Sequence, residues 1–321
     1  MCGAIRLAYV RLQAQGAHMA TEPRQQLSDT NTSSRHRALL LSGLPVTERR
    51  LQVAGVSTAV LEGGAGAPIL LLHGPGDFAG MWMRVIPDLV TTHRVVAPDL
   101  PGHGASELVD GRLDADGLRA WLSGLIERTC PSPPVLVGHV LGGAIGARFA
   151  MNHGDRLSGL VLVDSLGLAR FRPAPMFALT MLAFLTRPTD RTYTRFMRQC
   201  SFDLDGLRHD LGPRWEPFLA YSLERARGPN AKIAGRLFRE FGIPSIPPDD
   251  LARIAVPTTL IWGRHDRANR LRIARDASAR YGWPLHVIEN CADDPPRDQP
   301  LVFLEALRMA LGIEKRQQVT A

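Results

Sequence analysis

The sequence predicts an α/β fold in which a mainly parallel sheet is covered by helices on both faces. Over residues 51–164 and again over residues 257–311, short apolar runs alternate with segments of helical period. This alternation is typical of a parallel sheet, because parallel neighbours need a crossover connection. Residues 165–250 interrupt it with a helical segment rich in Arg, Pro and aromatic residues. We therefore expect one sheet domain with an inserted helical cap.

The individual elements are predicted from their apolar spacing. Runs of Val, Ile and Leu bounded by Gly, Pro or Asp indicate buried strands, and apolar residues three or four apart indicate helices packed on them. We expect strands at residues 51–53, 57–61, 68–73, 94–97, 135–137, 160–163, 257–262 and 285–289. We expect helices at residues 37–44, 81–90, 113–128, 143–151, 271–281 and 301–311.

The two ends of the chain differ from the sheet domain in composition. The N-terminal segment is rich in Gln, Ser, Thr and Asn and lacks the apolar run of a secretory signal, so we expect it to be disordered. Met19 is an alternative start of translation. The expected divisions are a disordered extension at 1–45, the first part of the core at 46–164, the cap at 165–250, the second part of the core at 251–313 and a tail at 314–321.

Composition limits the class of protein. Hydrophobic residues make up 45% of the chain and charged residues 21%, as in ordinary soluble domains. The net charge of +7 comes mainly from arginine, and no basic block with interleaved aromatic residues indicates a nucleic-acid partner. The apolar run at residues 176–185 has about half the length of a membrane span. We expect a cytoplasmic protein with no membrane span and no nucleic-acid partner.

No cofactor or metal is predicted. The four cysteines are scattered without the spacing of a zinc site or a disulfide framework. The sequence also lacks a Gly-x-Gly-x-x-Gly motif after a strand and a phosphate-binding P-loop.

The most informative stretch is residues 135–151, which predicts a buried strand, a sharp turn and a helix of small residues. Gly138 and Gly142 permit the turn, which we call the elbow. This is the layout that projects a nucleophilic side chain above a sheet. The residue at its tip is Val140, which carries no nucleophilic atom.

Four motifs, in order along the chain, carry a resemblance to a known family. They are Leu70–Gly74 with Gly76, Val95–Ser106, Val135–Gly143 and Leu260–Asp266. Over residues 51–311 the chain resembles proteins of the α/β-hydrolase fold, whose inserted cap also matches the predicted helical segment. The resemblance implies an α/β-hydrolase fold and a catalytic triad in the order nucleophile, acid, histidine.

The resemblance assigns the triad positions, and only the acid is kept. Asp266 stands at the acid position and Val140 at the nucleophile position. The motif before the last helix places Asp293 where the histidine is expected, with Asp294 as the alternative if the register shifts by one. Ser-His-Asp hydrolysis is therefore not expected, because it needs an attacking oxygen and a base.

The oxyanion hole is also incomplete by this resemblance. Leu141, after the nucleophile position, keeps one N–H donor. The second donor position, after Gly74, is Pro75, which has no N–H. Gly76 is the neighbour that could replace it.

The acidic residues are the remaining candidates for chemistry. If Asp266 and Asp293 touch, both cannot ionise cheaply, so the pair could transfer a proton or activate water. The alternative is that Asp266 pairs with an arginine: Arg264, Arg267 or Arg297.

Three further polar residues lie near the expected site. Asp164, at the carboxyl end of a strand, is a second candidate acid. His265 is a tentative displaced base. His139, beside the elbow tip, is a pocket residue that is expected to pack against the strand.

Three functions remain open from the sequence. The first is an atypical hydrolase-like enzyme on a small apolar organic substrate. The second is a non-hydrolytic isomerase, lyase or cyclase that uses the acidic residues. The third is a catalytically inactive ligand-binding pseudo-hydrolase. The oligomeric state is not predicted.

Overall fold

A computed structural model describes residues 34–109 and 112–312 and contains one mixed sheet of nine strands. Their order is β1-β2-β4-β3-β6-β7-β8-β9, with β5 paired to β2. The strands are β1 Thr47–Val53, β2 Val56–Gly63, β3 Ala67–Leu72, β4 His93–Pro98, β5 Glu107–Leu108, β6 Val135–His139, β7 Gly159–Val163, β8 Thr258–Gly263 and β9 Leu285–Ile288. β1, β2 and β5 pair antiparallel, and the six strands from β4 to β9 along the sheet are parallel. The predicted α/β-hydrolase fold is confirmed.

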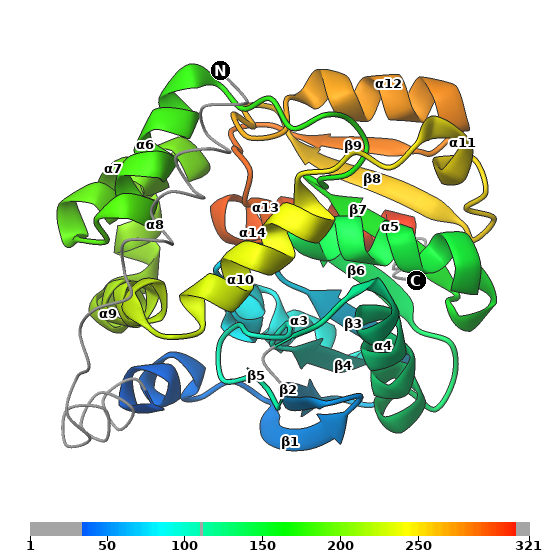
Figure 1. The fold of residues 1–321 in the computed structure, drawn as a ribbon, viewed down its shortest axis with the longest axis horizontal. Coiled ribbons are helices and arrows are strands. Elements are labelled where there is room, and N and C mark those ends of the chain that lie inside the picture. The colour runs from blue at the N-terminus through cyan, green and yellow to red at the C-terminus, as the bar shows by residue number, and fades with distance from the viewer. Residues whose placement is uncertain (1–33, 110–111, 313–321) are drawn as a thin grey trace, which may run out of the picture.

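Helices cover both faces of this sheet (Figure 1). One layer is α4 Ala115–Thr129, α5 Leu141–His153 and α12 Leu271–Tyr281; the other is η1 Ala79–Arg84, α3 Ile86–Leu89, α13 Pro295–Asp298 and α14 Pro300–Ala310. Each face of the sheet has its own apolar core, and alternate residues of a strand pack into one core or the other. On β3, Leu70 and Leu72 pack toward the first layer, and Ile69 and Leu71 pack toward the second. This period of two is what a sheet buried on both faces requires.

Most of the inserted cap is a group of helices at one side of the sheet: α6 Pro175–Thr186, α7 Asp190–Cys200, α8 Leu204–Leu211 and α9 Trp215–Arg227 (Figure 1). α10 Ala231–Leu237 and α11 Pro248–Leu251 lead back to the sheet domain, where α11 contacts α5. Short η turns lie at Gly212–Arg214 and Phe238–Gly242 in the cap and at Gly154–Arg156 before β7. The apolar core of the cap includes Val140 and Ala268, which follow strands β6 and β8. The cap therefore lies over the carboxyl ends of these strands.

Two sequence predictions are wrong. The single helix expected at 81–90 is broken into η1 and α3, because Pro87 lacks the N–H that a continuous helix would bond to the Met83 carbonyl. The expected disorder does not extend to residue 45, since residues 34–41 form a helix. On that helix Leu40 is buried in the cap core, and Arg37 forms a buried ion pair with Asp99 at 2.9 Å.

Residues 1–33, including Met19, and the whole of the predicted tail at 314–321 lie outside the described residues, as does residue 313. Within the described part of the chain, no helix has the length and apolar character needed to cross a bilayer.

Candidate functional site

The elbow has the strained backbone that the glycine spacing predicts. Val140 has φ 47° and ψ −98°, a conformation that a β-branched residue adopts only under constraint. A Cβ on Gly138 would lie 2.5 Å from the Gly142 carbonyl oxygen, and a Cβ on Gly142 would lie 2.3 Å from the Leu72 oxygen. Only glycine fits at both positions, so the close approach of β6 and α5 depends on them.

The tip of the elbow is apolar and enclosed. The Val140 side chain is buried in the cap core, which also contains Phe78, Met83 and Leu166. Its backbone is held at both ends, since the Val140 N–H donates to Val163 O at 2.9 Å and the Val140 carbonyl accepts from Leu166 N at 3.1 Å. The elbow thus keeps its shape without a reactive group.

The expected oxyanion hole has a reduced set of backbone N–H donors. Leu141 is the first residue of α5, so its N–H has no acceptor within the helix. Across from it, Gly74 to Asp77 form a turn in which the Asp77 N–H donates to Gly74 O at 3.4 Å and Gly76 has φ +68°. Pro75 lies within this turn and offers no donor.

The carboxyl ends of β7 and β8 bring Asp164 and Asp266 together. Asp164 is fully buried, and its Oδ1 accepts from Gly263 N at 3.0 Å. Asp266 Oδ1 accepts from the N–H groups of Ala268 at 2.6 Å and Asn269 at 2.7 Å. The two carboxyl groups are near enough for each to shift the pKa of the other. Two buried carboxylates at such close range cannot both ionise cheaply, so one of them is expected to hold a proton.

The electrostatics place that proton on Asp164. Burial and then the neighbouring charge of Asp266 raise the pKa of Asp164 well above its ordinary value. Burial also raises the pKa of Asp266, to about 7, although the bonds from backbone N–H groups and the neighbouring Asp164 carboxyl group favour its ionised form. Neither Oδ2 atom has a hydrogen-bond partner among the described residues.

Asp293 is a third buried acid next to this pair. Its N–H donates to Cys200 O in the cap at 3.2 Å, and its Oδ1 has no partner among the described residues. Burial, followed by the charges of Asp266 and Asp294, raises its pKa well above the ordinary value. The structure therefore extends the expected pair: the charge of Asp266 raises the pKa of Asp164 as well as that of Asp293.

None of the three arginines that could have neutralised Asp266 does so. Arg264 pairs with Glu289, and Arg267 donates to the Gln199 carbonyl at 2.9 Å. Arg297 pairs with Asp77 at 2.6 Å and with Asp294 at 2.8 Å. We call Asp164, Asp266 and Asp293 the acid cluster.

A second buried group of charges lies on the donor side of the site. It consists of Asp77, Asp294, Arg225 and Arg297, which we call the ion network. Burial alone would raise the pKa of Asp77, but Arg297 and Arg225 lower it to about 2. The pairing of Asp77 with Arg225 was not predicted from the sequence. An acid directly after the Gly76 turn was the available signal, whereas no motif marks Arg225 in the cap.

The two candidate histidines lie in different surroundings. His139 is buried, its Nε2 lies 2.6 Å from the Asp293 carbonyl oxygen, and burial lowers its pKa to about 4. It is a neutral residue that positions the backbone of the acid cluster. His265 is exposed, and its ring packs on Phe202 at 4.9 Å between centroids. The structure does not bring the His265 side chain to the acid cluster.

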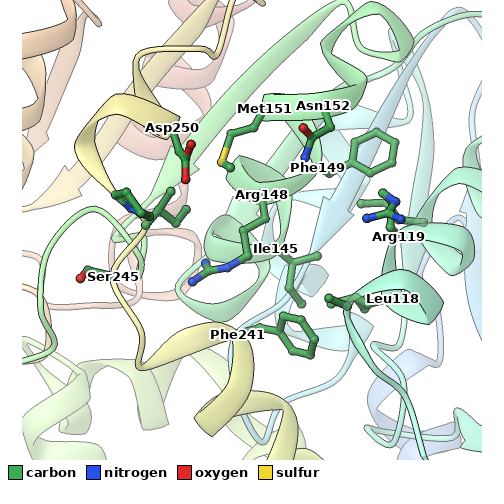
Figure 2. Close-up of a pocket in the computed structure, with 14 residues that line it drawn as sticks. Leu118, Arg119, Ile145, Arg148, Phe149, Met151, Asn152, Phe241, Ser245 and Asp250 are labelled. Atoms are coloured by element: carbon green, nitrogen blue, oxygen red, sulfur yellow. The ribbon is translucent and has the colours of Figure 1, made fainter.

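A cavity of about 280 Å³ lies away from the elbow, between α4, α5 and residues 241–250. Figure 2 shows the Arg148 side chain crossing it, with Ile145 and Phe241 alongside. Its lining includes none of the predicted site residues. Among the described residues, no group of three or more His, Cys, Asp or Glu side chains is arranged to hold a metal ion.

Comparison with known sequences agrees with the observed fold. The model of the Alpha/beta hydrolase family matches residues 69–306. An uncharacterized protein of Mycobacterium tuberculosis is 30% identical, over 81% of this chain and 80% of its own length. A pimeloyl-[acyl-carrier protein] methyl ester esterase of Aeromonas hydrophila is 29% identical, over 80% of this chain and 100% of its own length.

Solved structures show the same fold. A 2-hydroxy-6-oxo-6-phenylhexa-2,4-dienoate hydrolase from a Rhodococcus strain superposes with a TM-score of 0.73 at 24% identity, over 83% of this chain and 99% of its own. A carboxylesterase from Bacillus subtilis gives a TM-score of 0.72 at 18% identity, over 89% of this chain and 98% of its own.

Proposed function

Since this chain belongs to the alpha/beta hydrolase family, we propose that it is a hydrolase-like enzyme that acts on a small apolar molecule without a covalent nucleophile. The observation that carries the proposal is the close pair of buried carboxyl groups, Asp164 and Asp266, whose Oδ2 atoms have no partner among the described residues. Pairs of carboxyl groups with shifted pKa values are typical of acid–base sites, because burial keeps one acid protonated near neutral pH.

The two acids have different roles in this proposal. Asp164 holds its proton at neutral pH. Asp266, with a pKa of about 7, is ionised in part of the molecules and accepts a proton from water or from a carbon next to a substrate carbonyl. Asp293 is a neutral carboxyl group beside them and is a source of a second proton. The pair thus supports water activation and also the proton transfers of an isomerase, lyase or cyclase.

The remaining groups restrict the chemistry. Leu141 N–H is one donor for a developing oxyanion, and Pro75 leaves the opposite side without its usual donor. A missing donor slows acyl-transfer reactions by roughly 10²–10³. The surroundings of Val140 are apolar, which favours a substrate with a hydrophobic body.

The first substrates to test are those named for the relatives, a methyl ester and a 2-hydroxy-6-oxo-dienoate. Reactions in D₂O followed by NMR would report both turnover and exchange of carbon-bound hydrogen. We expect Asp266→Asn and Asp164→Asn to abolish turnover or exchange, and the exposed-site control Asp276→Asn to retain it. A fluorophosphonate probe should label no serine, whereas labelling would show a nucleophile elsewhere.

The enclosure of Val140 favours a second candidate, a catalytically inactive protein that binds an apolar ligand. Only 6% of the Val140 side chain is exposed, so a substrate must displace cap residues to reach the elbow. If no substrate shows turnover or hydrogen exchange while an apolar ligand still raises the melting temperature, this second candidate replaces the first.

A further inference from the structure

Helix α6 presents an uncharged, apolar surface to solvent. Its twelve residues, Pro175–Thr186, contain no charged side chain. Phe177 and Met181 pack inward, while Met176 and Leu179 are 55% and 60% exposed. Leu182 and Ala183 continue this outward face at helical spacing and are partly exposed.

Exposed arginines lie on both sides of α6 along the chain. Residues 170–198 contain six arginines and one acid, Asp190, for a net charge of +5 within a chain whose total is +7. All six are exposed: Arg170, Arg172, Arg187, Arg191, Arg195 and Arg198. Among the described residues, no ion pair involves any of them.

Helix α7 places three of these arginines in one row. Arg191, Arg195 and Arg198 follow the i, i+4, i+7 spacing, opposite the buried residues Tyr193 and Met197. α7 packs beside α6 at one edge of the molecule (Figure 1). Stacking of Phe184 on Phe196, at 5.8 Å between centroids, fixes the two helices together. The hairpin therefore combines an apolar face with a fixed row of cations.

We propose that the α6–α7 hairpin docks this protein on the surface of an anionic lipid bilayer. An apolar helix face flanked by arginine is the combination that binds at a membrane interface, where apolar side chains enter the acyl boundary and cations contact phosphate groups. A second copy of the chain fits this surface less well, because two such faces would bring their arginines together. Docking would present the cap, and hence the apolar site under it, to a molecule dissolved in lipid.

The test is sedimentation of the full chain with vesicles. We expect binding to vesicles of mixed phosphatidylglycerol and phosphatidylcholine, with little binding to phosphatidylcholine alone. High salt should weaken binding, because the Debye length falls from about 8 Å at physiological ionic strength to about 3 Å at 1 M.

Two pairs of matched variants locate the surface. The double change Met176→Glu and Leu179→Glu should weaken vesicle binding by about tenfold or more. Leu301→Glu with Met309→Glu, at residues of α14 that are 75% and 59% exposed, should not. The change Arg191→Glu with Arg195→Glu should weaken it by about tenfold. Arg272→Glu with Arg275→Glu on α12 makes the same change in net charge and should have a smaller effect. Circular dichroism would confirm that each variant folds.

Three results would overturn the proposal. The first is no binding to anionic vesicles. The second is equal weakening by the α7 and α12 charge reversals, which would indicate attraction by net charge alone. The third is a change from dimer to monomer, seen by light scattering in the α6 variant, which would identify the apolar face as a contact between copies.

Discussion

The acid cluster and the ion network both contain largely buried aspartates, and Asp77 of the ion network has a pKa shifted in the direction opposite to those of the acid cluster. Asp77 in the ion network lies against Arg297 and Arg225, and its pKa falls to about 2. Asp164 in the acid cluster lies against another carboxyl group, and its pKa rises. Burial disfavours the charged form of both residues, so the partner decides the direction. The ion network joins the cap to the core, whereas the acid cluster holds protons.

Asp294 belongs to the ion network, but its pKa is shifted upward like those of the acid cluster. It therefore shows how closely the two clusters lie. It pairs with Arg297, yet burial raises its pKa to about 6, because the arginine only partly offsets that burial. Asp294 also contributes to the raised pKa of its neighbour Asp293. The boundary between paired and unpaired acids thus falls between two adjacent residues.

The largest expected effect is on the ion network. Arg297→Met would leave Asp77 and Asp294 buried without their shared cation. We expect the free energy of unfolding to fall by about 3–5 kcal/mol, measured by urea denaturation. Arg308→Met, which breaks an exposed pair with Asp88, is the control and should cost less than about 1 kcal/mol. Equal effects of the two changes would show that the ion network is not a structural clamp.

The next effect concerns the missing catalytic groups. Val140→Ser with Asp293→His restores a nucleophile and a base, and we expect a weak esterase activity on a small activated ester. Adding Pro75→Ala returns an N–H donor to the other side of the site. It should raise that rate by roughly 10²–10³. Absence of activity in both variants would argue against the positions assigned to the triad.

Because the acid cluster contains acids with raised pKa values, we expect the free energy of unfolding to fall as pH rises. Asp266 has a raised pKa in the folded protein, so above about pH 4 the folded state binds more protons than the unfolded state. Its contribution is lost progressively between about pH 4 and 7, at up to about 1.4 kcal/mol per pH unit. Asp266→Asn should flatten this part of the stability profile, measured by denaturation at several pH values. A profile identical to that of the unmodified chain would contradict a raised pKa at Asp266.

The smallest effect is expected at His265. Its side chain is exposed and lies away from the acid cluster, so His265→Ala should change the free energy of unfolding by no more than about 0.5 kcal/mol. Turnover, once a substrate is identified, should stay unchanged. A large loss of turnover with unchanged stability would restore His265 as the displaced base.

The backbone of the site could be predicted from the sequence, but the pairing of its side chains could not. Gly138, Gly142 and Pro75 act through backbone sterics and a missing N–H, which are properties of the residue type itself. The partner of Asp266 depends on how the loops after β7 and β9 place Asp164 and Asp293, and spacing does not encode that. Likewise, Arg225 reaches Asp77 only because the cap folds back over the sheet.

The proposed function depends on Asp164 and Asp266 holding one proton between them at neutral pH. A ¹³C NMR titration of aspartate carboxyl groups, assigned with Asp164→Asn and Asp266→Asn, measures this. We expect one carboxyl group that titrates near pH 7 and a second that remains protonated there, with both signals altered in each variant. Full ionisation of both groups by about pH 5, near the ordinary carboxyl range, would contradict it.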